Sequence, residues 1–115
     1  MKKHEGFCPV RDIMAEIGSK WALLIMYTLE EGTLRFSDIW RAIPDISQKV
    51  LTGELRTLES FSLIRRNVYA EVPPRVEYSL TDLGRSFMKA VHPVIKWAEA
   101  NKDACLERRT QPTNG

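Results

Sequence analysis

Apolar residues follow a helical period through the first thirty residues of the chain. Val10, Ile13, Met14 and Ile17 have the i, i+3, i+4, i+7 spacing of one helix face, and Gly18 ends that pattern. Residues 19–31 are apolar around most of a helix, through Trp21, Leu23, Leu24, Ile25, Met26, Tyr27 and Leu29. The pattern therefore predicts a short first helix and a second helix at the centre of a core.

Two further helices are predicted close together in the middle of the chain. After "TLRF" at 33–36, which suits a short strand, Ser37 is a candidate cap for a helix that Pro44 ends. Ser47 opens a longer helix. Its buried stripe consists of Leu51, Leu55 and Leu58. This spacing is typical of a helix-turn-helix over about 37–61.

Alternation of apolar and polar residues predicts a two-stranded ribbon over about 64–80. One face carries Val68, Ala70, Val72, Val76, Tyr78 and Leu80. The other face is polar and carries Arg65, Asn67, Tyr69, Glu71, Arg75, Glu77 and Ser79. Pro73 and Pro74 lack an N–H group and fit a stiff tip between the strands. Because an isolated hairpin is marginally stable in water, we expect the apolar face to pack on the rest of the domain.

A long helical segment is predicted over about 81–108, capped by Thr81, interrupted at His92 and Pro93, and followed by a flexible tail at 109–115. It carries more apolar surface than one small domain covers. We expect a second copy of the chain to cover Phe87, Val91, Val94, Ile95, Trp97 and Ala98. Alternatively, these side chains fold back on their own core.

The order of predicted elements favours one fold: mainly α with a small β-ribbon, a winged helix-turn-helix flanked by N-terminal and C-terminal dimerisation helices. In a winged helix, the second helix of the pair enters the major groove of DNA and the ribbon lies along the flanking backbone or minor groove. A chain of 115 residues fits a single domain of this kind.

Composition narrows the possibilities further. Seventeen Lys and Arg against fifteen Asp and Glu give a net charge of +2, so a nucleic-acid surface must come from local placement of bases. The sequence has no long apolar run and no signal-peptide pattern, and we expect a cytoplasmic protein without membrane contact. Cys8 and Cys105 have no metal-type spacing, and His4 with Cys8 finds no further ligand. We expect no cofactor, no metal and, without any catalytic motif, no enzyme activity.

The outward face of the 48–60 helix suits DNA. With the leucines inward, a rotation of 100° per residue places Lys49, Thr52, Gly53 and Arg56 outward, with Gln48 at the N-terminal edge. Gln pairs with adenine, Arg and Lys with guanine or phosphate, and the Thr methyl group with thymine. Any solvated helix face also has such residues. Gly53, however, costs about 0.8–1 kcal/mol relative to Ala in a helix, which close approach to a DNA backbone or a tolerant position would explain.

The ribbon offers further cations. Arg75 lies beside the stiff tip, and Arg65 and Arg66 lie at the base, where each is a candidate phosphate or minor-groove contact. Glu71 and Glu77 alternate with these bases. Pairing across the strands would make the charge pattern purely structural.

Four stretches are long enough to carry a family resemblance: "CPV" at 8–10, "IGSKWALLIMYTL" at 17–29, "LRFSDIWRAIPDISQKVLTGELRTLE" at 34–59 and "YAEVPPRVEYSLTDLG" at 69–84. Together they resemble the HxlR-type transcriptional regulators, a branch of the MarR-like winged-helix proteins. The resemblance implies a bacterial homodimer that binds double-stranded DNA and dimerises through its N-terminal and C-terminal helices. We expect it to repress transcription from a pseudo-palindromic operator.

The resemblance also assigns candidate contacts. It implies contacts from the recognition helix through Ser47, Gln48, Lys49, Thr52 and Arg56. Arg75 is implied as a wing contact, with Arg35 and Lys20 as weaker phosphate contacts. Two departures are Gly53, where relatives carry a larger and usually polar residue, and Pro93, which breaks a helix that is often continuous.

Cys8 occupies a position where some members of that family have a cysteine that senses oxidants or electrophiles. The thiolate is the reactive form, and the bases near it in sequence are Lys2, Lys3, His4 and Arg11. A sensing thiol and an inert, partly buried thiol are both compatible with this sequence.

Two other functions fit the same fold. The first is a winged-helix module that binds proteins, which the salt dependence of DNA binding would distinguish. The second is a regulator that responds to a small molecule held between the winged domain and the dimer helices. The sequence does not identify that effector.

Overall fold

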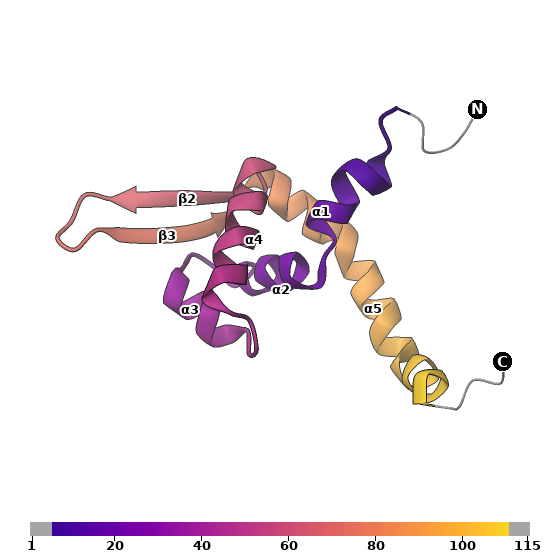
Figure 1. Cartoon of the computed structure of the whole chain (residues 1–115). Coiled ribbons are helices and arrows are strands. Elements are labelled where there is room, and N and C mark those ends of the chain that lie inside the picture. Colours follow the sequence, from indigo (N-terminus) through magenta and orange to yellow (C-terminus); the bar gives the residue numbers. More distant parts are fainter. Residues whose placement is uncertain (1–5, 111–115) are drawn as a thin grey trace.

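The computed structural model describes residues 6–110 and has the predicted order of elements (Figure 1). The helices are the π-helix η1 (Val10–Met14), α1 (Ala15–Ile17), α2 (Lys20–Leu29), α3 (Phe36–Ala42), α4 (Gln48–Ser60) and α5 (Asp82–Thr110). The strands are β1 (Leu34–Arg35), β2 (Ile64–Tyr69) and β3 (Arg75–Leu80). The prediction of a mainly α winged helix-turn-helix with a small β element is confirmed.

The core lies between α2, α4 and the base of the sheet. α4 buries the predicted stripe of Leu51, Leu55 and Leu58, and α2 buries Ala22, Ile25, Met26 and Leu29. Truncating a leucine in such a core to alanine costs about 2–5 kcal/mol. The prediction that α2 sits at the centre of the core holds for one side only, because Leu24 and Tyr27 are 38% and 49% exposed. The exposed side lines an open groove next to the turn after α3.

The starts of α3 and α4 show how capping sets the helix-turn-helix. Ser47, predicted to open the second of these helices, caps α4, because its hydroxyl oxygen accepts the N–H of Val50 at 3.1 Å. The cap predicted at Ser37 is wrong. The N-cap is Arg35, so α3 starts two residues earlier, at Phe36, and the carboxylate of Asp38 accepts the N–H of Arg35 at 3.3 Å.

The turn between α3 and α4 is held by an aromatic side chain. The indole N–H of Trp40 donates to the carbonyl of Ile46 at 2.8 Å, and Ile43 and Ile46 are buried beneath the turn. These contacts link the last turn of α3 to Ile46, the residue before the cap of α4. They fix the direction in which α4 leaves the turn.

The three strands form one antiparallel sheet in the order β1-β3-β2. β2 and β3 make the wing, which projects beyond the helices (Figure 1). Ile64, Tyr78 and Leu80 are buried at its base, whereas Val68 is 55% exposed and Val72 is fully exposed. The prediction that the whole apolar face packs on the domain is therefore wrong for the outer half. That half extends past the helices that cover the base.

α5 runs without interruption from Asp82 to Thr110, so the predicted break at His92 and Pro93 is wrong. A proline inside a helix loses one backbone hydrogen bond and costs about 3 kcal/mol. On the same turn, the imidazole of His92 donates to the carboxylate of Glu30, at the end of α2, over 2.7 Å. This contact ties the turn to α2. Residues 109 and 110, predicted to start a flexible tail, belong to α5, and 111–115 lie outside the described residues.

The start of α5 is joined closely to the end of α4. Thr81 caps α5 as predicted, accepting the N–H of Gly84 at 3.0 Å, and its hydroxyl donates to the carbonyl of Ser62 at 2.6 Å. A Cβ on Gly84 would lie 2.1 Å from the carbonyl oxygen of Leu63, so this contact requires glycine. We name Thr81, Gly84, Ser62 and Leu63 the α4–α5 junction. Within residues 6–110, no helix is long and apolar enough to cross a membrane.

Candidate nucleic-acid interface

The outward face of α4 carries the side chains expected from its helical period. Gln48, Lys49, Gly53 and Arg56 are exposed and Thr52 is half-buried, while the leucine stripe faces the core. All five line one shallow hollow of about 610 Å³, together with Phe36 of α3. The predicted geometry of this helix is therefore present, with four polar side chains on one open surface.

A second hollow, of about 320 Å³, joins α4 to the base of the wing. It is lined by Phe36, Thr52, Leu55, Arg56, Glu59, Arg66 and Tyr78. Thr52 and Arg56 line both hollows, so the surface continues from α4 to Arg66. We name Gln48, Lys49, Thr52, Arg56 and Arg66 the recognition face. The sequence analysis did not identify Phe36, which lines both hollows. Its position as an apolar residue at the start of α3 could have indicated it.

The two arginines at the base of the wing lie on opposite faces. Arg66 pairs in register with the buried Tyr78, on the face toward α4, and Arg65 pairs with Ser79 on the other face. Arg75 pairs with Tyr69 and shares the face of Arg65. Neither Arg65 nor Arg75 lines the two hollows of the recognition face.

Arg75 contacts other side chains of the wing. Its guanidinium lies 3.4 Å from the carboxylate of Glu71 and 4.0 Å from that of Glu77, and it stacks 4.2 Å from the centre of the Tyr69 ring. The side chain is about one third exposed, at 32%. The internal pairing that the sequence left open is therefore present at the wing tip.

The remaining candidate contacts lie at the edges of this surface. The hydroxyl of Ser47 is used as the cap of α4. Arg35 is exposed on β1, and Lys20 opens α2 with its ammonium group 4.1 Å from the centre of the Trp21 ring. Neither cation lines the two hollows.

The predicted dimer residues of α5 divide into two groups. Phe87, Val91 and Ile95 pack against the core of their own chain. Val94 and Trp97 are 63% and 60% exposed, and Ala98 is exposed as well. The N-terminal region adds further exposed apolar side chains at Phe7, Val10 and Met14.

Cys8 is buried, with 4% of its surface exposed, and Cys105 is exposed near the end of α5. The N–H of Cys8 donates to the carboxylate of Asp12 at 2.8 Å, and the guanidinium of Arg11 binds the same carboxylate at 2.9 Å. The hydrogen bond from Arg11, and then that from Cys8, lower the pKa of Asp12 to about 2. Lys2, Lys3 and His4 lie outside the described residues. Within 6–110, no three His, Cys, Asp or Glu side chains gather as metal ligands do.

Residues 16–105 match the family model described as HxlR-like helix-turn-helix. An HTH-type transcriptional regulator of Methanothermobacter thermautotrophicus is 48% identical over 99 residues, which cover 86% of this chain and 76% of that protein. The solved structure of the transcriptional regulator ytfH from Salmonella typhimurium has a TM-score of 0.80 and 38% identity, covering 90% of this chain and 93% of its own. The redox regulator HypR in its reduced form has a TM-score of 0.79 and 39% identity, covering 86% and 98%.

Proposed function

Because the chain belongs to the HxlR-like helix-turn-helix family and is a transcriptional regulator, we propose that it acts as a homodimer on one specific operator and represses transcription there. The observation that carries this proposal is the recognition face. Four of its five side chains project from α4, whose opposite side is anchored by three buried leucines. A helix anchored in this way keeps its orientation when it enters a groove, which lets side-chain chemistry select bases.

Each side chain of the recognition face has a role in this proposal. Gln48 and Thr52 suit adenine and the thymine methyl group, and Lys49 and Arg56 suit guanine or phosphate. Arg66, at the base of the wing, suits a phosphate of the flanking backbone. The overall charge of +2 is small, so affinity depends on these few cations. Such a regulator works on the chromosome, and we expect it in the cytoplasm.

Dimerisation supplies the specificity that one helix lacks. The exposed apolar residues of α5 and of the N-terminal region, Val94, Trp97, Phe7, Val10 and Met14, offer a surface for a second copy. A twofold dimer places two recognition helices about one DNA turn, roughly 34–36 Å, apart. A pseudo-palindromic operator bound in this way blocks access of polymerase to a promoter.

Selection from a random duplex pool tests this proposal. We expect enrichment of pseudo-palindromes whose half-sites lie about 10–10.5 base pairs apart. Binding of the enriched duplex, followed by fluorescence anisotropy, is expected to weaken linearly in log salt. The double variant Lys49→Ala, Arg56→Ala should lose binding, and Lys96→Ala, an exposed lysine on α5, should not. A folded dimer that enriches no sequence would favour the protein-binding module instead.

We also propose that Cys8 makes DNA binding sensitive to oxidants. The support is a relative of known structure, HypR, which is named as a redox regulator. Treatment with diamide should lower operator affinity in the parent protein and in Cys105→Ser, and leave Cys8→Ser unchanged. Equal responses of the Cys8→Ser variant and the parent would remove Cys8 from the mechanism.

A further inference from the structure

Phe36, the first residue of α3, lies where the two hollows of the recognition face meet. Phe36, Thr52 and Arg56 line both hollows, and no other described residue does so. The remaining lining comes from α4 and the base of the wing. α3 therefore contributes one aromatic side chain to a surface that is otherwise built from α4 and the wing.

The ring of Phe36 is held in place by the core of the domain. It is half-buried and packs against the buried cluster between α2, α4 and the sheet. Close packing of this kind keeps side chains in defined rotamers. Thr52 is also half-buried and precedes Arg56 by one turn of α4. A fixed apolar surface therefore lies next to Arg56.

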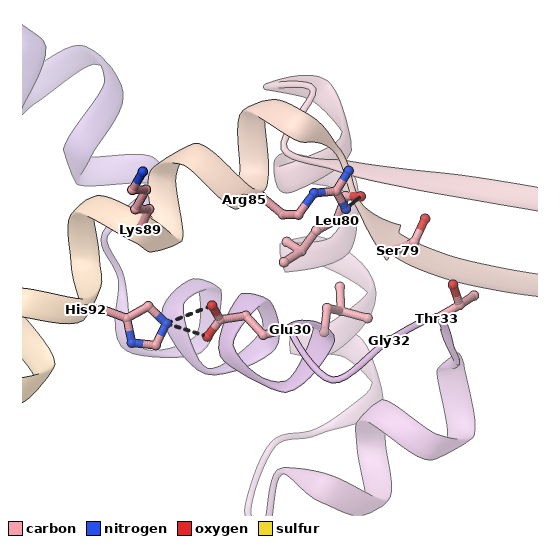
Figure 2. A pocket seen from close by; sticks show the side chains of 9 residues that line it. Glu30, Gly32, Thr33, Ser79, Leu80, Arg85, Lys89 and His92 are labelled. Atoms are coloured by element: carbon pink, nitrogen blue, oxygen red, sulfur yellow. Dashed lines mark hydrogen bonds and ion pairs between the residues drawn. The ribbon is translucent and has the colours of Figure 1, made fainter.

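The positive charge of Arg56 is not used within the fold. Arg56 is exposed and has no ion-pair partner within residues 6–110. Another hollow, where α5 passes the end of α2, differs in this respect. Figure 2 shows the imidazole of His92 there on the carboxylate of Glu30, at 2.7 Å. Those two groups satisfy each other, whereas the donors of Arg56 are available to a base.

The surface beside Thr52 and Arg56 is open. Gly53 lines the larger hollow, and a Cβ placed on it meets no atom within 4 Å. A side chain at this position would project from the same helix face as Arg56, three residues further on. Its absence leaves room for the edge of a base to reach Thr52 and the ring of Phe36.

The chemistry of these side chains matches a particular pair of bases. In the major groove, thymine presents a C5-methyl group that makes apolar contacts with Phe and Thr, and guanine presents two acceptors to a bidentate arginine. Side chains one helical turn apart are about 5–6 Å apart at Cβ. Successive bases of one strand are about 3.4 Å apart. Thr52 and Arg56 therefore reach neighbouring bases, and the ring of Phe36 suits a methyl group better than a phosphate.

We propose that Phe36 and Thr52 together contact the C5-methyl group of a thymine that lies next to the guanine bound by Arg56. α3 as well as α4 then selects the base sequence. This inference rests on the proposed function and names the pair of bases that the recognition face reads. The same contact accepts 5-methylcytosine, which carries the same methyl group, so methylation of a cytosine at that position strengthens DNA binding.

The first test uses the full chain and the operator selected from a random duplex pool. Each thymine beside a guanine is replaced in turn by deoxyuridine, which lacks only the methyl group. Anisotropy titrations at fixed salt should show a loss of about fourfold for the contacted thymine in one half-site, and about 15-fold for both half-sites. Deoxyuridine outside the half-sites should leave the affinity unchanged.

Two variants test which side chains make the contact. Thr52→Ser keeps the hydroxyl and removes the methyl group, and Phe36→Leu keeps an apolar side chain and removes the ring. In each, the loss caused by deoxyuridine should fall below about twofold, as expected for a coupled pair. A variant that is merely less stable binds both duplexes less well and leaves their ratio unchanged.

The chain offers a matched control for each variant. Thr57 is half-buried on α4, and its hydroxyl donates to the carbonyl of Gly53 at 3.1 Å. Phe61, at the end of α4, packs against the same core as Phe36. Neither residue lines the two hollows of the recognition face. Thr57→Ser and Phe61→Leu should therefore show the same loss with deoxyuridine as the parent protein.

Cytosine methylation provides a gain instead of a loss. With cytosine in place of the contacted thymine, methylation at C5 should raise the affinity of the parent protein by about fourfold. In Thr52→Ser it should raise the affinity by less than about twofold. A methylated cytosine that binds no better than an unmethylated one would refute the acceptance of 5-methylcytosine.

The outcomes separate this contact from the proposed function. If an operator is selected but no deoxyuridine weakens binding, or if its half-site has no thymine beside a guanine, the methyl contact is refuted and the proposed function stands. If Thr52→Ser and Phe36→Leu both keep the loss of the parent, the methyl group is read elsewhere and the contact is likewise refuted. If only one variant reduces the loss, the role of the other residue is refuted. If a folded dimer selects no sequence, the proposed function fails and the methyl contact fails with it.

Discussion

The outward face of α4 and the tip of the wing carry the same kind of side chain in opposite electrostatic settings. Within residues 6–110, Lys49 and Arg56 on α4 have no ion-pair partner. Arg75 on the wing lies between two carboxylates and over an aromatic ring. A phosphate that approaches α4 therefore meets exposed cations without ion-pair partners among the described residues. A phosphate that approaches the wing tip meets Arg75, whose charge is largely neutralised by Glu71 and Glu77.

This difference shows that an arginine count does not measure a DNA-binding surface. To bind a phosphate, Arg75 must leave its carboxylates or bring them near the phosphate, and either change offsets part of the attraction. We infer that the affinity for DNA resides mainly in the recognition face. The contacts of Arg75 with Glu71 and with the Tyr69 ring instead join the two sides of the wing near its tip.

The largest expected effect comes from Arg56→Ala. Arg56 lines both hollows of the recognition face, and loss of an arginine contact to a base costs about 1–3 kcal/mol. Operator affinity should fall by about 5- to 150-fold in anisotropy titrations at fixed salt, with an unchanged melting temperature. A loss no greater than that of Arg75→Ala would reverse the ranking of the two regions.

A matched pair of variants tests the two faces of the wing. Arg66→Ala should remove one phosphate contact, weaken all duplexes similarly and reduce the slope of log affinity against log salt by about 0.9. Arg65→Ala, its neighbour on the opposite face, should leave that slope unchanged. A reduced slope for Arg65→Ala, with no change for Arg66→Ala, would mean that the wing presents its other face to DNA.

Gly53→Ala tests whether α4 approaches a DNA backbone closely. A Cβ at this position meets nothing within 4 Å, so the substitution should stabilise the helix by about 0.8–1 kcal/mol. Thermal unfolding should show a higher midpoint. Operator affinity should fall if the glycine admits the backbone, and an unchanged affinity would identify Gly53 as a tolerant position.

The smallest effects are expected at the wing tip, and they include a gain. The double variant Glu71→Gln, Glu77→Gln removes both carboxylates from Arg75, so the salt slope should become steeper by about 0.9 as Arg75 gains a phosphate. Arg75→Ala in the parent should change affinity by less than about fivefold, the range of an exposed ion pair. If the double variant leaves the slope unchanged, the glutamates do not restrain Arg75.

Local chemistry in the sequence was enough to predict several parts of the fold. The helix start at Ser47 and the cap at Thr81 depend on a hydroxyl and an N–H a few residues away, and the stripe of Leu51, Leu55 and Leu58 depends on the helical period. Such contacts lie within one or two turns, so a sequence pattern contains them. The outward position of Arg56 follows from that stripe.

Contacts between distant segments were beyond the same reasoning. The prediction of a break at Pro93 did not take into account the contact between His92 and Glu30. These residues are 62 positions apart, and their contact holds that turn of α5. The placement of Arg66 on the face toward α4 depends on its register with Tyr78. The order of residues suggested the internal pairs of Arg75, but distances were needed to identify them.

The α4–α5 junction makes α5 a lever. At 1.5 Å per residue its 29 residues span about 43 Å, and the requirement for glycine at Gly84 fixes one end of that length against the end of α4. A swing of about 5° at this pivot displaces the far end by roughly 4 Å. A small change of angle at Gly84 would therefore change the distance between the α4 helices of two protomers by several ångströms.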